Sequence, residues 1–311
     1  MSAVAELLAQ LVALPTQQPG PDGRSGDELA FCTHVAPLLR RLGADAVDVG
    51  QTPRTNGSPG AYVFARWGTP RRVINAHLDT VPANAGWSRD PWQPAIVGDR
   101  LYGLGAADTK GAIAATLIAL DGHAPRDLGV LFSGDEEAGS HVLRAFLGSP
   151  LMTGIREVIV CEPTARTAGI AHRGILGQHA VATGPGGHSS KSDHLPKPLA
   201  DLARLATALD DAGRRRLHDG PADMQGTCLN LAALHGGVAF NVIAARAELV
   251  RPFVRSIGPL DFWTEAALYA AHGLDAIVIG PGDIAQAHGA DEWVALADLD
   301  WAIELYRALL L

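Results

Sequence analysis

Histidine and carboxylate side chains follow several predicted strands of this sequence at the point where each strand ends. The first example is His77-Leu78-Asp79, which comes directly after a buried strand predicted over 73–76. Residues i and i+2 of a strand project to the same side, so the Asp79 carboxylate could hold one ring nitrogen of His77 while the other nitrogen binds a metal ion. Taken alone, the segment is equally compatible with a histidine that is hydrogen-bonded at the sheet edge and binds nothing.

Four more donors stand in loops that follow predicted strands or open a predicted helix: Asp108, Glu137, Glu162 and His288. Each has a plain structural alternative, such as a helix N-cap for Asp108 or a solvated loop for Glu137. Together, imidazole and carboxylate donors suit Zn²⁺ and related divalent cations, and five of them, one bridging, are enough for two ions. The acids at 135–137 are consecutive, and adjacent residues point in different directions, so one carboxylate could bind a metal ion while its neighbour stays free to move a proton.

The glycines of the segment 103–111 raise the alternative of a phosphate-binding loop. The segment lacks the Lys-Ser/Thr ending of a P-loop, and its glycine spacing does not fit the dinucleotide-binding fingerprint. We therefore interpret it as a sharp turn that leads into an apolar helix over 112–120, with Asp108 at the junction.

The composition bounds the class of protein. The 311 residues are 47% hydrophobic and carry a net charge of −8, as expected of a globular protein with an ample core. This gives no electrostatic footprint for nucleic acid, and no apolar run approaches a membrane span. The N-terminus lacks the features of a signal peptide. The three widely spaced cysteines, Cys32, Cys161 and Cys228, form no zinc-finger or redox pattern, so we expect them to be reduced in a cytoplasmic protein.

Alternating strands and helices predict an α/β fold with its site at the carboxyl ends of the strands. The N-terminal part includes a capping-box pattern, Ser25 to Glu28, that predicts a helix ending at Leu42. The middle of the chain instead predicts an inserted α+β domain, with a strand, a helix and two strands over 178–183, 198–218, 227–234 and 245–250. Its His188 stands in a glycine-rich loop and is either a surface side chain or a group that reaches into the site.

These motifs resemble those of the dinuclear zinc amidohydrolases, a family that contains acetylornithine deacetylase, succinyl-diaminopimelate desuccinylase and related carboxypeptidases. The resemblance covers nearly the whole chain and rests on the segments 77–82, 103–111, 135–137, 161–164 and 187–188. The run from Asp261 to His288 is most similar to the acetylornithine/acetylcitrulline deacetylase branch. The resemblance implies a zinc-peptidase-like catalytic domain, with a central mixed sheet flanked by helices, over residues 1–173 and 258–311. It also implies an inserted α+β lid and dimerisation domain over residues 174–257.

The resemblance also implies a role for each metal-binding donor. His77 and Glu162 would bind one metal ion. Glu137 and His288 would bind the other, and Asp108 would bridge the two. The ions would be Zn²⁺, two per subunit, with Co²⁺ as the alternative.

Catalytic and substrate-binding roles follow from the same resemblance. Glu136 would be the general base that takes a proton from the attacking water and later gives it to the leaving amine. Asp79 would hold the ring of the first histidine, and His188 would help to stabilise the oxyanion of the tetrahedral intermediate. Asn241 and Arg251 match lid positions that contact substrate in relatives, and a guanidinium suits a substrate carboxylate.

The implied activity is metal-dependent hydrolysis of the amide bond of an Nα-acyl amino acid, by an acetylornithine or acetylcitrulline deacetylase of arginine biosynthesis. The alternatives within the family are a succinyl-diaminopimelate desuccinylase and a dipeptidase or carboxypeptidase, since the metal ligands do not distinguish these substrates. A metal-binding protein that has lost catalysis is the non-enzyme alternative, and the presence of Glu136 argues against it. The expected partners are a small N-acyl amino acid and a second copy of the chain, joined through the lid, with no nucleic acid and no membrane.

The sequence departs from the family pattern at one place. The family's lid continues past the position of Arg251 with a further helix and strand, whereas here Arg251 to Pro259 leads almost directly into the segment 261–263. Either the lid of this protein is small or a stretch is missing from the sequence. We favour a missing stretch, because an α+β sandwich without half of one layer would expose an apolar sheet face. An unbroken, well-packed chain from Arg251 to Pro259 would contradict this.

Overall fold

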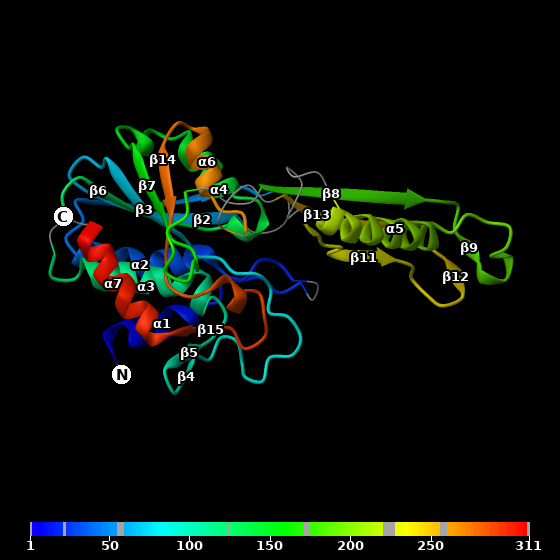
Figure 1. Ribbon diagram of the computed structural model, residues 1–311, viewed down its shortest axis with the longest axis horizontal. Coiled ribbons are helices and arrows are strands. Elements are labelled where there is room, and N and C mark those ends of the chain that lie inside the picture. The colour runs from blue at the N-terminus through cyan, green and yellow to red at the C-terminus, as the bar shows by residue number, and fades with distance from the viewer. Residues whose placement is uncertain are drawn as a thin grey trace. The chain divides into compact units, whose positions relative to one another are not determined.

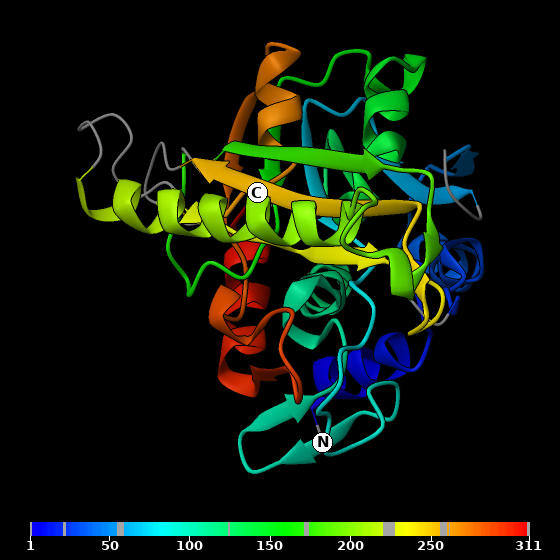
Figure 2. The same cartoon turned by 90° about the vertical axis from the view of Figure 1, so that its right-hand side faces the viewer.

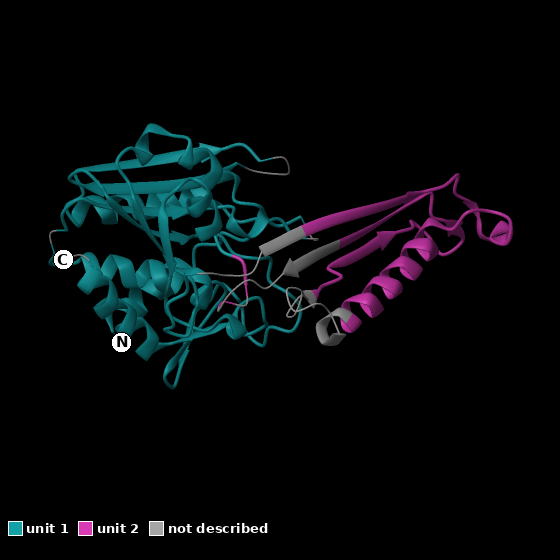
Figure 3. Ribbon diagram, turned by 45° about the horizontal axis from the view of Figure 1, so that its top comes forward, with its two compact units in different colours: residues 1–170, 264–311 teal, residues 171–263 magenta. Residues whose placement is uncertain are grey.

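The computed structural model describes residues 2–20, 23–54, 59–123, 125–170, 174–219, 228–255, 260 and 262–309. The chain divides into two compact units (Figure 3): residues 1–170 with 264–311 make up unit 1, and the inserted residues 171–263 make up unit 2. Among the described residues, no helix has both the length and the hydropathy that a membrane span requires.

A six-stranded mixed sheet forms the centre of unit 1 (Figure 1), in the order β1-β2-β6-β3-β7-β14. Its strands are β1 (Ala46–Thr52), β2 (Gly60–Trp67), β3 (Arg72–His77), β6 (Leu128–Ser133), β7 (Glu157–Val160) and β14 (Asp275–Val278). The last four pair in parallel, whereas β1 and β2 add antiparallel pairs. Short runs rich in Val, Ile and Leu are typical of buried parallel strands. Four carboxyl ends therefore meet at one edge of the sheet.

Helices cover both faces of this sheet (Figure 1). One face carries α1 (Ala3–Val12), α2 (Glu28–Arg41), α3 (Gly111–Leu120) and α7 (Leu296–Leu309), and the other carries α4 (His141–Leu147) and α6 (Ala266–Ala271). The side chains of β2 alternate accordingly: Val63 joins the main core, whereas Tyr62 and Phe64 pack edge-on against Phe146 of α4. α3 is apolar all round and almost fully buried, as expected of a helix that contacts both α1 and α7.

A small three-stranded sheet joins two distant segments of unit 1. Its order is β15-β5-β4, with bounds β4 (Ala95–Val97), β5 (Arg100–Tyr102) and β15 (Trp293–Ala295). Strands of three residues, such as β4 and β15, carry too little pattern to be predicted from the sequence. Single turns of tighter or wider helix occur at Ala106–Lys110, Glu136–Ala138, Pro150–Met152, Ser189–Lys191 and Ile284–Gln286.

The start of α2 corrects the predicted capping box. The N-cap is Asp27, whose carboxylate accepts the Ala30 N–H at 2.9 Å. Glu28 does not cap the helix: it is 5% exposed, and its carboxylate accepts the Ala61 N–H of β2 at 2.8 Å. The predicted capping box was wrong for two reasons. The Glu28 carboxylate makes a tertiary contact with β2 instead of a local one, and the adjacent Asp27 is an equally good N-cap.

In its described part, unit 2 is an antiparallel sheet with α5 (Pro198–Asp219) along one face (Figure 2). The strands are β8 (Gly174–Thr183), β10 (Cys228–Leu229), β11 (Ala233–Gly236) and β13 (Arg246–Arg255), and β9 (Gly187–His188) pairs separately with β12 (Val242–Ile243). Leu202 of α5 packs on Ala247 and Leu249 of β13. The single strand predicted over 227–234 is wrong, since the described residues there form the two short strands β10 and β11.

The strand β13 bears on the predicted missing stretch. It is longer than expected, and its ten residues, Arg246–Arg255, all pair with β8. Residues 256–259 lie outside the described residues. The missing stretch after Arg251 therefore stays a prediction.

Candidate metal centre

The structure brings the predicted donors of unit 1 to the carboxyl edge of the parallel strands. His77 is the last residue of β3, Glu137 lies in the helical turn after β6, and Glu162 stands two residues after β7. Asp108 lies in the turn before α3, and His288 lies in the loop that follows β14. Five separate parts of the chain thus contribute to one place.

Asp108 is central to this cluster, because each of its carboxylate oxygens faces a different imidazole. Oδ1 lies 2.8 Å from Nε2 of His77, and Oδ2 lies 3.4 Å from Nε2 of His288. Each histidine has a second carboxylate beside it: Glu162 Oε2 is 3.9 Å from the first Nε2, and Glu137 Oε1 is 2.9 Å from the second. The arrangement consists of two half-sites, each with an imidazole and a carboxylate, that share Asp108.

The electrostatics of these residues fit a site for divalent cations. Burial raises the pKa of Glu162 well above its usual value and also raises that of Glu137, and the charge of Asp108 adds to both effects. Burial would lower the pKa of each histidine, but contacts with Asp108 outweigh it. The pKa of His77 is raised well above its usual value, and that of His288, which also contacts Glu137, is raised to about 11. Protonated imidazoles therefore supply the positive charge that a cation would bring to the same carboxylates.

Hydrogen bonds to Asp79 hold the turn that carries Glu136 and Glu137. Its carboxylate accepts the backbone N–H groups of Glu136 at 3.1 Å and Glu137 at 3.2 Å, and a side-chain N–H of Gln18 at 2.6 Å. His77 Nδ1 lies 3.0 Å from the Asp79 backbone carbonyl and 3.6 Å from its carboxylate. The carbonyl is the nearer acceptor for this ring nitrogen, so the predicted hold of the carboxylate on the ring stays a prediction.

Glu136 lies in the same turn and has the acid–base properties of a proton carrier. Burial raises the pKa of its carboxyl group well above the usual value; the nearby His77 opposes this, whereas Glu137 and Glu162 add to it. A raised pKa favours the protonated form of a carboxyl group, and this is how enzymes prepare such a group for proton transfer.

Sequence reasoning missed a buried ionic network behind this turn. The side chain of Arg54 is 5% exposed; it pairs with Glu28, lies 3.2 Å from Asp135, and donates to Gln18 Oε1 at 2.7 Å. The side-chain N–H of Gln18 then donates to Asp79, which holds the acidic turn. A Cβ on Gly134 would clash with the Glu28 carboxylate, so a glycine at this position leaves room for Glu28 in the network. Of these residues only Glu28 belongs to a recognisable sequence pattern, the capping box, and that pattern predicts a helix cap and not an ion pair with Arg54.

Comparison with known proteins places the chain in a family. Residues 73–311 match peptidase family M20/M25/M40. The chain belongs to this family. N-acetyl-L-citrulline deacetylase from Xanthomonas campestris pv. campestris is 33% identical over 309 residues, covering 80% of this chain and 84% of the relative. Acetylornithine deacetylase from Photorhabdus laumondii subsp. laumondii is 29% identical over 265 residues, covering 79% of this chain and 66% of the relative.

The M20 fold is evident in the structure as well. A metallo-carboxypeptidase of the M20 family from Sulfolobus solfataricus has a TM-score of 0.73 at 16% identity, over 100% of this chain and 99% of that one. The predicted α/β class, with a mixed sheet flanked by helices, is therefore confirmed, as is the resemblance read from the motifs. M20 relatives named as deacetylases and carboxypeptidases identify the chain as a hydrolytic enzyme, which sets the non-enzyme alternative aside.

The alignment with the Xanthomonas deacetylase extends over 309 positions and uses 80% of the 311 residues of this M20 chain. The relative therefore has residues inside the aligned span that have no counterpart here.

The predicted residues of unit 2 are arranged as follows. His188 is exposed, and its Nδ1 lies 2.9 Å from Ser190 Oγ. Asn241 is also exposed, and its neighbour Val242 pairs with His188 between β12 and β9, so the two predicted residues lie close together. The backbone of Arg251 belongs to β13, and its side chain lies outside the described residues. The catalytic and substrate-binding roles of these residues stay predictions.

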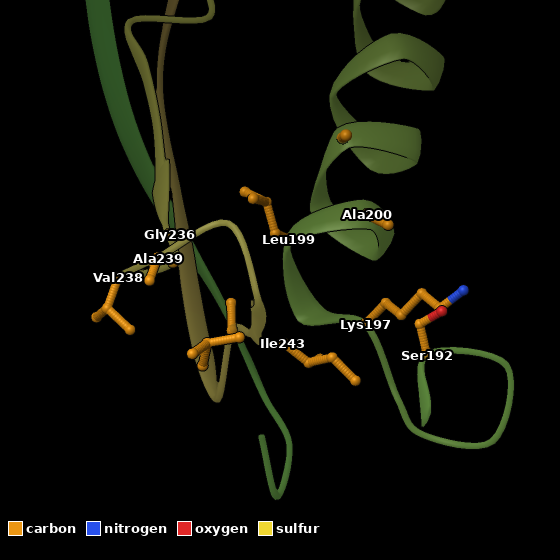
Figure 4. A pocket seen from close by; sticks show the side chains of 12 residues that line it. Ser192, Lys197, Leu199, Ala200, Gly236, Val238, Ala239 and Ile243 are labelled. Atoms are coloured by element: carbon orange, nitrogen blue, oxygen red, sulfur yellow. The ribbon is translucent and has the colours of Figure 1, made fainter. Parts of the chain in front are cut away.

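Unit 2 also contains a cavity of about 610 Å³ between the start of α5 and the segment 236–244 (Figure 4). Leu199, Val238 and Ile243 give it an apolar lining, and Ser192 and Lys197 stand together at one side. None of the predicted metal-binding or catalytic residues lines this cavity.

Proposed function

We propose that this M20 enzyme hydrolyses the amide bond of an Nα-acyl amino acid, N-acetylcitrulline or N-acetylornithine, as a step of arginine biosynthesis. The observation that carries the proposal is the shared carboxylate of Asp108, with one histidine facing each of its oxygens. Paired half-sites of imidazole and carboxylate suit two Zn²⁺ ions, with Co²⁺ as the alternative. The choice of substrate is supported by the relatives that are named as N-acetyl-L-citrulline deacetylase and acetylornithine deacetylase.

The donors divide between two ions in this proposal. His77 and Glu162 would hold one ion, Glu137 and His288 would hold the other, and Asp108 would contact both. Two divalent ions lower the pKa of water and polarise a carbonyl group, which is the chemistry that amide hydrolysis requires.

The proton transfer is assigned to Glu136. It accepts a proton from the attacking water and delivers it to the leaving amine, so that one carboxyl group serves both halves of the reaction. The two hydrogen bonds from backbone N–H groups to Asp79 fix the position of this turn. Because the backbone is fixed, the Glu136 carboxyl group can occupy only a small range of positions, which favours proton transfer.

Unit 2 would serve as lid and dimerisation domain. His188 would stabilise the oxyanion, and Asn241 and Arg251 would bind the substrate, with the guanidinium pairing with its carboxylate. A homodimer formed through this unit belongs to the proposal, and light scattering on the purified full chain tests it. The cytoplasmic location stays a prediction.

The assay that tests the proposed function compares substrates on the purified full chain supplemented with Zn²⁺ or Co²⁺. The panel is N-acetylcitrulline, N-acetylornithine, N-succinyl-diaminopimelate and a set of dipeptides, with release of the free amine as the readout. We expect the highest kcat/KM for one of the two acetylated amino acids. A preference for the succinylated amine or for dipeptides would overturn the substrate and leave the family intact.

Zinc binding is expected to release protons and to weaken as the pH falls. In the metal-free protein the pKa of His288 is raised to about 11 and that of His77 is also raised, so both rings are protonated at neutral pH. An incoming ion must displace these protons, and a lower pH favours the protonated rings over the metal. Titration calorimetry near pH 6 and near pH 8, in two buffers of different ionisation enthalpy, measures the affinity and the protons released. An affinity that is the same at both pH values would contradict the assignment of these histidines as ligands.

A further inference from the structure

Glu292 is a buried carboxylate to which none of the roles above is assigned. It is 2% exposed and follows His288 by four residues. Its Oε2 accepts the Gly105 N–H at 2.9 Å, and its Oε1 accepts the N–H groups of Ala107 at 2.9 Å and Asp108 at 3.1 Å. One side chain thus satisfies three backbone donors of the turn that carries Asp108.

The pairing of β15 with β5 sets this contact. Trp293 lies opposite Tyr102, and one residue further along the Gly103 N–H donates to the Glu292 carbonyl at 2.9 Å. The turn beyond is tight: Gly105 has a φ of +80°, and a Cβ there would lie 2.7 Å from a neighbouring side chain. In such turns successive N–H groups converge on one side and form a concave binding place for an anion. Here the anion is a side chain of the same protein.

Asp79 makes the equivalent contact on the other acidic loop. It accepts the backbone N–H groups of Glu136 and Glu137, as Glu292 accepts those of the turn before α3. Asp79 stands two residues after His77, and Glu292 stands four residues after the other histidine. Each of these two buried carboxylates therefore connects a segment that contains a metal-binding histidine to a loop that contains metal-binding carboxylates.

We propose that Glu292 is a positioning residue for the metal centre. It fixes the backbone of Asp108 so that the two carboxylate oxygens stay directed at the two histidines, and it is not itself a ligand. The inference deepens the proposed function and rests on it for the presence of the ions. Without the Glu292 carboxylate, three buried N–H groups lose their acceptor, and the turn is expected to rearrange to recover hydrogen bonds.

The test uses Glu292→Gln in the full chain, which keeps the size of the side chain and replaces one acceptor oxygen by an NH₂ donor. In the metal-free protein we expect faster hydrogen exchange at the backbone amides of residues 105–108. On titration with zinc we expect an affinity weaker by about 10- to 100-fold, the usual effect of removing a group that orients a metal ligand. The KM for substrate at saturating zinc should stay at the wild-type value, because Glu292 is buried and both of its oxygens accept backbone N–H groups.

Glu304→Gln is the matched control, since it removes an exposed carboxylate that pairs with Arg307 on α7. It should leave exchange, zinc affinity and activity unchanged. A folded Glu292→Gln variant with wild-type exchange and wild-type zinc affinity would overturn the inference. If that variant fails to fold, Glu292→Asp, which keeps a carboxylate on a shorter side chain, replaces it, with changes expected in the same direction and of smaller size.

The outcomes separate this inference from the proposed function. A wild-type protein that binds zinc but hydrolyses no N-acyl amino acid would overturn the function, while weakened zinc binding by Glu292→Gln would still support the positioning role. An active wild type, together with wild-type exchange and wild-type zinc affinity in the folded Glu292 variant, would overturn only the positioning role. A wild type that binds no divalent ion would overturn both.

Discussion

Glu136→Gln is expected to retain zinc and to lower kcat by about 100- to 10,000-fold, the usual contribution of a positioned general base. Glutamine has the same size but cannot accept the proton of the attacking water. The carboxylates that face the two histidines are those of Asp108, Glu137 and Glu162, so the substitution leaves them in place. The backbone N–H of residue 136 still donates to Asp79, because that bond does not involve the side chain.

Zinc content and kcat on the preferred acetylated amino acid are the two measurements. Glu137→Gln is the matched control, since it is the same substitution in the same turn but removes an oxygen 2.9 Å from His288 Nε2. This control should weaken zinc binding, and excess zinc should restore part of its activity. A Glu136→Gln variant as active as the wild type would refute the general-base role. Loss of zinc from Glu136→Gln would instead identify Glu136 as a ligand.

The place of the donor cluster could be predicted because parallel strands bring their carboxyl ends to one edge. His77 and Glu162 each follow an apolar run short enough to be a buried strand, and the strands β3 and β7 are direct neighbours. The glycines before Asp108 predict a turn into a helix, and the structure has a turn there that leads into α3. These signals come from residues close together in the sequence, so the predicted place of the donors does not depend on the exact strand bounds.

The supporting groups could not be predicted, because their partners carry no sequence pattern. Glu292 binds backbone N–H groups, which every residue except proline possesses. Glu28 and Arg54 stand in segments that would suit an exposed helix start and a surface loop, and only the tertiary fold buries them. The pattern around Glu28 is also ambiguous, since the same four residues offer two acceptable helix caps.

Arg54→Met is expected to destabilise the protein by about 3–5 kcal/mol, the usual cost of removing one partner from a buried ionic network. The Arg54 guanidinium faces Glu28 and Asp135, whose side chains are 4% and 0% exposed. Methionine fills much of the same volume but removes the guanidinium that both carboxylates face. The Gln18 side chain, which links Arg54 to Asp79, also loses a donor.

The effect of Arg54→Met should depend on pH in a defined direction. Burial, with the charge of Asp79 adding to it, raises the pKa of Glu28 from 4.5 to about 7, although Arg54 acts to lower it. The unfolded chain releases this proton near the lower value and the folded chain keeps it to the higher one, so Glu28 costs stability as the pH rises between them. Without Arg54 the pKa of the folded state rises further. The destabilisation should therefore be larger near pH 8, where the wild-type Glu28 carboxylate is ionised beside Arg54, than near pH 5, where the folded protein keeps Glu28 protonated with or without the arginine.

Urea denaturation of the full chain at the two pH values measures the loss. The matched control is Arg72→Met, which removes an arginine of unit 1 that pairs with Glu157 at 2.7 Å but is 38% exposed. An exposed pair contributes about 1 kcal/mol or less, so this variant should unfold close to the wild type. Adding Glu28→Gln to Arg54→Met removes one of the orphaned charges, and the double variant should be more stable than the two single losses together predict. If Arg54→Met and Arg72→Met lost the same stability near pH 8, Arg54 would be no more than a surface arginine, and the network would not be what holds the acidic turn in place.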